Sequence, residues 1–172
     1  ASHGSGSTDL PKLSQAEITK LLKDAPLELP QDIYDVQPST TAPHSPGKIK
    51  SSVLQAALDR LNANRRIAGL PNVALDSALC ETAQYGAVLT ASIGMLDHNP
   101  SKPSGMDDAF YRKGAYGTSS SNLATGYTLN GAVDGWMDDS GSSNIARIGH
   151  RRWQLNPTMG KVGFGYCDWY SV

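Results

Sequence analysis

The side chains in this sequence with the most chemical potential are two histidines, one aspartate, one serine and one asparagine. They are His98, Ser121, Asn122, Asp139 and His150, and they lie far apart along the chain. A neutral imidazole can bind a metal ion or accept a proton, and a carboxylate can orient it. A serine hydroxyl can act as a nucleophile when a base lies beside it. These residue types are therefore candidates for a metal site, a hydrolytic site or a polar ligand site.

Each candidate lies at or just beyond the end of a predicted element, where side chains can converge without disturbing a core. Apolar residues recur at three- and four-residue steps in three segments, and in the second of these the stripe begins at Leu79. Near the end of the chain, bulky residues alternate with glycines, which predicts a strand with one bare face on which a helix could lie. The predicted elements are helices over 51–68, from Asp76 to about residue 90 and over 129–137, a structured loop over 99–122 with a short helix at 106–113, and a strand over 162–166.

Composition excludes several classes of protein. The chain has 15 basic and 16 acidic residues and a formal net charge of −1, so it lacks the basic footprint of a nucleic-acid binder. No apolar run reaches the roughly 20 residues that a transmembrane helix needs, and the first residues do not have a signal-peptide pattern. The motifs of phosphate-binding loops, zinc peptidases of the His-Glu-x-x-His type and serine hydrolases are also missing.

The chain divides into three predicted parts. Residues 1–7 are interpreted as an expression scar, so His3 is excluded from the chemistry. Residues 8–47 are expected to form a short helix at about 15–23, followed by an extended proline-rich linker. His44 lies in this linker and is interpreted as solvated. Residues 48–172 are expected to form one mixed α/β (α+β) domain.

Two cysteines and three tryptophans allow more than one interpretation. Cys80 and Cys167 are either two buried thiols or one long-range disulfide, because sequence alone does not give their separation. Trp136 lies on an apolar helix stripe and is assigned to the core, whereas Trp153 and Trp169 remain open between core and ligand surface.

Several segments, taken in order, resemble the CAP superfamily, which comprises cysteine-rich secretory proteins, antigen 5 and pathogenesis-related 1 proteins and is also called the SCP domain. Each segment is short, but their order and spacing together are specific, and the run from Gly149 to Pro157 resembles bacterial members. The similar segments are Leu61-Asn62-Ala63-Asn64-Arg65-Arg66, Gly69-Leu70-Pro71, the helix from Leu79 to Ala87, His98, Trp136, Gly149-His150 and Val162-Gly163-Phe164-Gly165.

The resemblance implies an α-β-α sandwich, a secreted or cell-surface location, and a cleft built around two histidines and two acidic residues. His98 and His150 match the histidines, and Asp139 lies where a glutamate is usual. Ser121 replaces the second acid, since many members have Gly-Glu-Asn where this chain has Ser120-Ser121-Asn122. A neutral hydroxyl supplies neither a carboxylate ligand nor a ready base, which weakens the metal and hydrolase hypotheses.

A second departure from the family pattern lies at the end of the chain. Members generally continue past the Val-Gly-Phe-Gly strand into at least one further strand, and we expect the sheet here to lack its last strand or strands. Such a sheet would have an open edge, which could pair with another chain.

Three functions follow as hypotheses. The leading one is a secreted or surface binding module that uses a cleft around His98 and His150, with Asp139, Ser121 and Asn122, for a protein, glycan or lipid ligand. The second is a metal-assisted hydrolase, such as a peptidase, with Zn²⁺ on His98 and His150. The third is a structural domain of a larger surface protein. The missing acid favours a binding module over an enzyme, and no residue identifies the ligand.

Overall fold

The computed structural model describes residues 12–25, 27–28, 30–141 and 145–172. The predicted expression scar with His3 lies outside these residues. The described part contains helices α1 (Gln15–Asp24), α2 (Ser51–Ile67), α3 (Ser77–Ile93), α4 (Asp108–Ser119), α5 (Leu129–Asp138) and α6 (Gly149–Gln154), and the short strands β1 (Tyr34–Val36), β2 (Lys48–Ile49), β3 (Ala74–Leu75), β4 (Ala124–Thr125), β5 (Lys161–Val162), β6 (Tyr166–Cys167) and β7 (Tyr170–Ser171).

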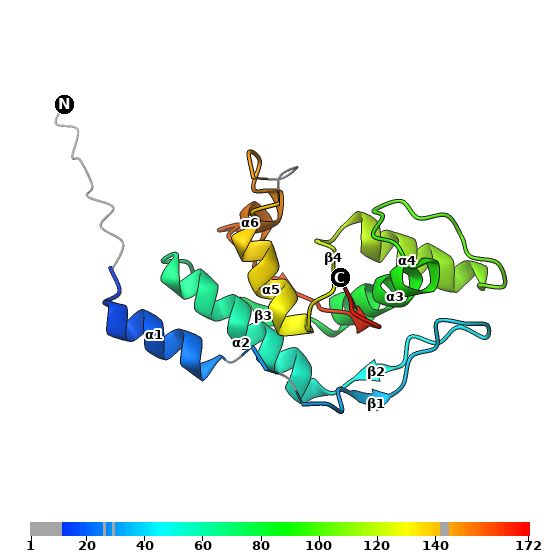
Figure 1. Cartoon of the computed structure of the whole chain (residues 1–172), viewed down its shortest axis with the longest axis horizontal. Coiled ribbons are helices and arrows are strands. Elements are labelled where there is room, and N and C mark those ends of the chain that lie inside the picture. Colours follow the sequence, from blue (N-terminus) through cyan, green and yellow to red (C-terminus); the bar gives the residue numbers. More distant parts are fainter. Residues whose placement is uncertain (1–11, 26, 29, 142–144) are drawn as a thin grey trace.

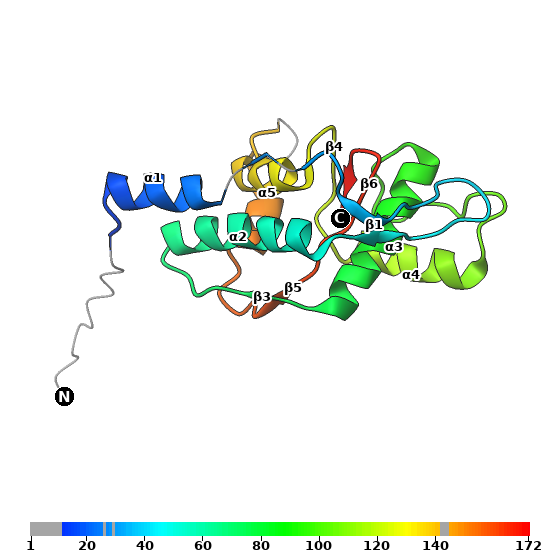
Figure 2. The same ribbon diagram turned by 90° about the horizontal axis from the view of Figure 1, so that it is seen from below.

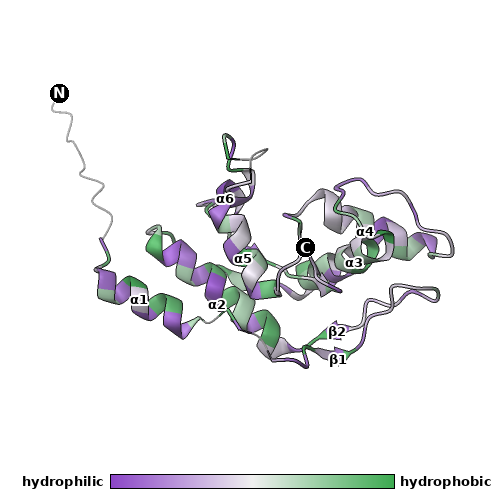
Figure 3. Cartoon of the chain, in the orientation of Figure 1, coloured by the Kyte–Doolittle hydropathy of each residue, from purple (hydrophilic) through white to green (hydrophobic). Residues whose placement is uncertain are grey.

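The helices predicted from periodicity form where the sequence placed them, and polar caps set their starts. Ser14 and Glu17 make a reciprocal capping box at the start of α1. The Asp76 side chain accepts hydrogen bonds from the first amides of α3, and Thr128 caps α5 in the same way. Figure 3 shows that α1 carries both hydrophilic and hydrophobic residues along its length.

The helices form two layers with short strands between them, which is the predicted α-β-α sandwich. Helices α2 and α5 pack together on one side, and α3 packs along α4 on the other (Figure 1). The C-terminal strands β6 and β7 contact α3, and β7 lies in the centre of a three-stranded sheet of order β4-β7-β6. Figure 2 shows the parallel β3–β5 pair running below α2. One apolar cluster fills the α2–α5 side and a second fills the α3–α4 side.

The glycine-rich end of the chain packs against α3, as the bare face of the predicted strand allows. A Cβ atom added to Gly163 would lie 2.2 Å from the carbonyl carbon of Leu79, and one added to Gly165 would lie 2.2 Å from the carbonyl oxygen of Ala83. The two ends of this segment pair with different strands, because Val162 pairs with Leu75 of β3 and Tyr166 pairs with Ser171 of β7. The prediction of one continuous strand over 162–166 was therefore wrong, because two short strands, β5 and β6, flank the segment that touches the helix.

A further strand follows the Val-Gly-Phe-Gly segment, which corrects the expectation that the sheet lacks it. This strand is β7, and it pairs with both β4 and β6. The outer edge of β6 is occupied by side chains. The backbone of Tyr166 donates to Gln84 Oε1 (2.9 Å), and its carbonyl oxygen accepts from Gln84 Nε2 (3.1 Å) and from the Tyr34 hydroxyl (3.1 Å). Pairing with another chain stays a prediction. These hydrogen bonds occupy the backbone groups that a partner strand would need at β6.

The proline-rich segment forms a hairpin, so the expectation of an extended linker was wrong. Strands β1 and β2 pair antiparallel, and Ser39 bridges Ser45 at the far end of the hairpin. Prolines 38, 43 and 46 fall in the loop of this hairpin, outside the paired strands, where a missing N–H leaves the pairing intact. The division of the chain near residue 47 stays a prediction.

The tip of the hairpin packs on the α3–α4 layer, which corrects the view of His44 as solvated. The His44 ring is half-buried, and its centroid lies 6.1 Å from that of Phe110 on α4. Gln84 on α3 donates to the carbonyl oxygen of Pro46 (2.8 Å). The hairpin is thus part of the packed molecule.

The largest difference between the predicted and the observed secondary structure is the length of helix α4. The interval 99–122 was expected to be mostly loop with a helix at 106–113, yet α4 runs to Ser119. A segment rich in glycine and serine favours a loop, but the glycines of α4 let this helix lie close to α3. A Cβ atom on Gly114 would be 2.9 Å from the Tyr85 carbonyl oxygen, and one on Gly117 would be 2.5 Å from that of Thr82.

The two cysteines are free thiols, so the disulfide alternative is wrong. Cys80 is half-buried on α3, and Cys167 is fully buried on β6. Burial raises the pKa of both thiols, that of Cys167 to about 12. Neither thiol therefore has the reactive thiolate of a catalytic cysteine.

Candidate functional site

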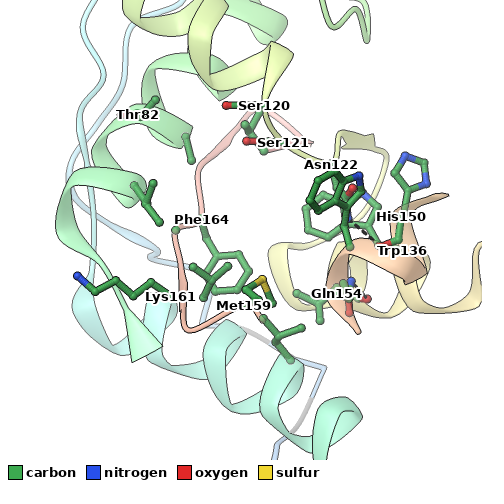
Figure 4. A pocket seen from close by; sticks show the side chains of 18 of the residues that line it. Thr82, Ser120, Ser121, Asn122, Trp136, His150, Gln154, Met159, Lys161 and Phe164 are labelled. Carbon is green, nitrogen blue, oxygen red and sulfur yellow. Dashed lines mark hydrogen bonds between the residues drawn. The ribbon is translucent and has the colours of Figure 1, made fainter. Parts of the chain in front are cut away.

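A cavity of about 790 Å³ lies between the two helical layers. Figure 4 shows Ser120 and Ser121 on one side of this cavity and Met159 and Phe164 on the opposite side. Its lining combines apolar residues with a polar group drawn from several elements. The apolar ones include Leu61, Leu79, Val133, Trp136, Met159, Val162, Phe164 and Val172, and the polar ones are Thr82, His98, Ser119, Ser120, Ser121, Asn122, His150, Gln154 and Lys161.

His98 enters the cavity wall from the segment that follows α3. The helix ends at Gly94, whose left-handed backbone (φ 67°) turns the chain towards α4. His98 Nδ1 lies 2.7 Å from the Thr118 carbonyl oxygen, and the Thr118 hydroxyl donates back to the His98 carbonyl (3.3 Å). Because a carbonyl can only accept, His98 Nδ1 must carry the proton. The ring is thereby held in one orientation and one tautomer while neutral.

His150 lies at the start of α6 and is oriented by a buried carboxylate. Its Nδ1 lies 2.9 Å from Asp139 Oδ1, and the Asp139 side chain is only 3% exposed. Asp139 Oδ2 also accepts from the backbone N–H of Arg151 (3.2 Å). Asp139 itself ends α5 in a left-handed conformation (φ 47°), which an aspartate tolerates better than most residues. Asp139 thus has two roles: its backbone turns the chain after α5, and its carboxylate holds the His150 ring in one orientation.

Arg151, which follows His150, donates hydrogen bonds to backbone carbonyls at the C-terminal end of α5. Arg151 Nε donates to the carbonyl oxygen of Met137 (2.5 Å), and its Nη2 donates to that of Asp138. These are among the carbonyls that a helix leaves unpaired at its C-terminus. Arg151 is therefore a locally paired residue that joins α6 to α5.

Ser121 and Asn122 follow α4, and both line the cavity. Asn122 Nδ2 donates to the carbonyl oxygen of His150 (3.2 Å), so the amide joins this loop to α6 (Figure 4). The structure thus brings His98, Ser121, Asn122 and His150 to one cavity. Asp139 is not among the lining residues, because it lies buried behind His150.

A scan with family models matches residues 58–169 to the Cysteine-rich secretory protein family, abbreviated CAP. The chain belongs to the CAP family. The matched range includes all five candidate side chains. A search of curated proteins found no match for the CAP domain described here.

Among solved structures, this CAP domain is similar to an extracellular protein containing a SCP domain from Bacillus anthracis. The two are 22% identical, with a TM-score of 0.52, and the match covers 72% of this chain. It covers 40% of that protein, so the present chain corresponds to less than half of its length. This likeness shows the fold. Within the described residues, none of the CAP domain's helices is both long enough and apolar enough to span a bilayer.

No complete set of zinc ligands is found among the described residues of the CAP domain. They contain no group of three or more histidine, cysteine, aspartate or glutamate side chains placed to hold one ion. Catalytic zinc usually has three protein ligands and structural zinc four. Two imidazoles, one of them paired with Asp139, fall short of this requirement.

Sequence reasoning missed part of the CAP cavity. Leu79 was expected in the core but is 43% exposed and lines the cavity, as do the exposed Tyr116 and Trp153. Trp136, by contrast, is buried as expected and donates its indole N–H to the Leu123 carbonyl (3.0 Å). Periodicity places a side chain on a face of its helix, but it does not show whether a neighbour covers that face.

Proposed function

We propose that this CAP domain is a secreted binding module that holds a small amphiphilic molecule in its cavity. The single observation that carries this proposal is the character of the lining. Apolar side chains cover much of it, the polar remainder is hydroxyl, amide, imidazole and one lysine, and no aspartate or glutamate occurs among the lining residues that are described. The similar Bacillus anthracis protein is described as extracellular, which supports the secreted location.

The apolar part of the cavity supports binding of a hydrocarbon body. Val133 and Phe164 belong to the core cluster of the α2–α5 side and also face the cavity. Burial of apolar ligand surface contributes about 25 cal/mol per Å². A volume of about 790 Å³ falls within the range of sites that take small molecules.

The polar part of the cavity supports recognition of a head group. His98, Ser121, Asn122 and His150 offer donors and acceptors without a fixed negative charge. Lys161 also lines the cavity, but its ammonium pairs with Asp76 (2.8 Å) outside the lining. A neutral or weakly acidic head group therefore suits this surface better than a cation.

The experiment is a titration with 8-anilinonaphthalene-1-sulfonate and with dodecanoate as probes, followed by fluorescence and calorimetry. Leu79→Asp places a charge on the lining, whereas Leu96→Asp alters a leucine of similar exposure (38% against 43%) that is not a lining residue. We expect Leu79→Asp to weaken binding at least about tenfold through desolvation of the new carboxylate, and Leu96→Asp to bind as wild type. Absence of saturable binding, or equal affinity in Leu79→Asp, would contradict the proposal.

A metal-assisted or metal-free hydrolase, such as a peptidase, is the second candidate. The observation that favours it is the pair of Asp139 and His150, since a buried carboxylate that orients an imidazole is half of a catalytic triad. Ser121 is the candidate nucleophile, and His98 with His150 are the candidate ligands of Zn²⁺. Calorimetric titration with Zn²⁺ and assays of peptide hydrolysis, on wild type and on His98→Ala and His150→Ala, test this candidate. Activity that both substitutions abolish would select it over the binding module.

A structural domain of a larger surface protein is the third candidate. It is supported by the length of the Bacillus anthracis relative, of which this chain matches 40%. It is compatible with ligand binding, and a full-length gene sequence would test it.

A further inference from the structure

The turn between β6 and β7 holds a tryptophan in an unfavourable backbone conformation. Cys167 pairs with Tyr170, so the hairpin closes with the two residues Asp168 and Trp169. Their φ angles are 46° and 69°, both in the left-handed region. Two-residue turns of this kind favour Asn or Asp first and Gly second. Asp168 satisfies this preference, whereas a bulky residue at the second position is strained.

The Trp169 side chain lies largely outside the core. Trp169 is 57% exposed, and it belongs to neither apolar cluster. Its backbone carbonyl accepts from the Gly126 N–H (3.0 Å), a contact that any residue could make. Strained residues that persist without a packing role occur mostly at binding sites. The position of Trp169 therefore points to a function at the surface.

A second exposed aromatic ring lies beside this turn. Thr125 pairs with Tyr170, and the Gly126–Trp169 hydrogen bond brings Tyr127 next to the hairpin. The Tyr127 ring is backed by two glycines of α5. A Cβ atom built on Gly135 would lie 3.6 Å from Tyr127 Cζ and 3.8 Å from both Cε atoms, and the hydroxyl oxygen is not among its three nearest atoms, so one face of the ring covers this helix.

The backing by α5 leaves the other side of Tyr127 to solvent, and the residue is 49% exposed. A Cβ atom built on Gly131 would lie 3.5 Å from Tyr127 Cβ and 3.7 Å from Cδ1, so the start of the side chain also lies close to α5. The Tyr127 ring is thus supported by α5, and the tight turn fixes the backbone from which the Trp169 side chain extends. A ring supported in this way loses little side-chain entropy when it binds.

We propose that Tyr127 and Trp169 form a glycan-binding surface that stacks on the sugar rings of a β-1,4-linked polysaccharide. The flat faces of such sugars carry C–H groups, which are attracted by the negative face of an aromatic ring. The neighbours Thr125, Asp168 and Tyr170 supply hydroxyl and carboxylate groups for the sugar hydroxyls.

The surroundings favour a glycan over a protein or a lipid surface. The exposed large apolar residues of the described chain include several aliphatic ones, yet none lies within the segments 124–128 and 166–171 that form this surface. Neither Tyr127 nor Trp169 lines the cavity. The glycan surface is therefore a second site, separate from the proposed cavity ligand.

The test is calorimetric titration with two probes, N-acetylchitohexaose and cellohexaose, supported by co-sedimentation with insoluble chitin and cellulose. The decisive variant is Trp169→Gly, because glycine suits the left-handed position and should leave the melting temperature unchanged or higher. We expect it to weaken binding of at least one probe by about tenfold or more, and Tyr127→Ala to do the same. Trp153→Ala is the matched control, since Trp153 is also an exposed tryptophan (66%) but lies at the cavity.

Retained binding by Trp153→Ala together with loss in Trp169→Gly would support the glycan surface. Failure of the wild-type protein to bind either probe, or equal binding by a folded Trp169→Gly variant, would overturn it. Loss in Trp153→Ala alone would also overturn it, because the glycan would then occupy the cavity. Dye binding to the cavity should be the same in Trp169→Gly and wild type, so this proposal and the cavity proposal can fail separately.

Discussion

The two walls of the cavity are held together by opposite means. The α3–α4 wall uses close contacts between backbones, at Gly114, Gly117, Gly163 and Gly165. The α5–α6 wall uses buried polar side chains. Asp139 binds His150 and the backbone of Arg151, and Gln154 Nε2 donates to the Val133 carbonyl (2.8 Å).

Arginines of α2 extend the polar scheme around the α5–α6 wall. Arg65 is fully buried and donates to the carbonyl oxygens of Gln154 (2.6 Å) and Asn156 (3.0 Å). Arg60 pairs with Asp134 on α5 and donates to the Ala25 carbonyl (2.9 Å). One wall should therefore be sensitive to added volume, and the other to lost charge and lost hydrogen bonds.

The largest effect is expected from Gly165→Ala on the backbone-packed wall. The new methyl group would meet the Ala83 carbonyl at 2.2 Å, and backbone atoms cannot move aside as a flexible side chain can. We expect a loss of about 3 kcal/mol or more in the free energy of unfolding, measured by urea denaturation. Gly160→Ala is the control, because nothing lies within 4 Å of its built Cβ. Equal stability of the two variants would contradict the close packing.

A smaller effect is expected from Asp139→Asn on the polar wall. Asparagine keeps the shape and tolerates φ 47°, but its NH2 group replaces one of the two oxygens that accept from His150 and Arg151, so the change removes the charge and one acceptor. We expect a loss of about 2 kcal/mol in unfolding free energy, since a charge-assisted hydrogen bond in a buried site is weakened. Asp138→Asn, at an exposed neighbour, should change stability by less than about 0.5 kcal/mol. A similar loss in both variants would show that the His150 contact is not the cause.

The smallest effect is expected from Asp76→Asn, which tests a polar contact on the otherwise backbone-packed wall. The hydrogen bond and charge of Lys161, with the N–H groups of α3, hold the pKa of Asp76 below its usual value. Because the folded pKa is lowered, the ionised carboxylate stabilises the protein above the unfolded pKa, and this contribution is lost as pH falls through the folded pKa.

Asn is also a good helix cap, so Asp76→Asn isolates the charge. The melting temperatures of wild type and variant should differ slightly at pH 7 and converge towards pH 2, as followed by circular dichroism. A difference that is constant from pH 7 to pH 2 would argue against the lowered pKa.

The sequence predicted the elements whose stability is local. The helices at 51–67, 77–93 and 129–138 were expected from apolar spacing and from caps such as Asp76, because these signals act within a few residues. The family, the sandwich and the cavity residues His98, Ser121, Asn122 and His150 also came from the order of short segments. Their roles in binding or catalysis stay predictions.

What the sequence misplaced depends on contacts between distant segments. Gly114 and Gly117 look like loop residues until α3 is seen beside them, and Leu79 looks like a core residue until the cavity is seen beside it. The proline-rich hairpin is ordered by partners such as Gln84 and Phe110 that lie far away in the chain.

The sequence by itself thus determined which residues could form helices and which could do chemistry, because helix periodicity and side-chain chemistry are local properties. The tertiary structure alone decided that His150 is oriented by Asp139 and that His98 is oriented by Thr118. It also decided that the exposed residues Trp169 and Tyr127 lie on segments joined by the hydrogen bond between Gly126 and Trp169. The physical reason is that burial, orientation and strain are set by which surfaces meet, and these surfaces come from segments that only the folded chain brings together.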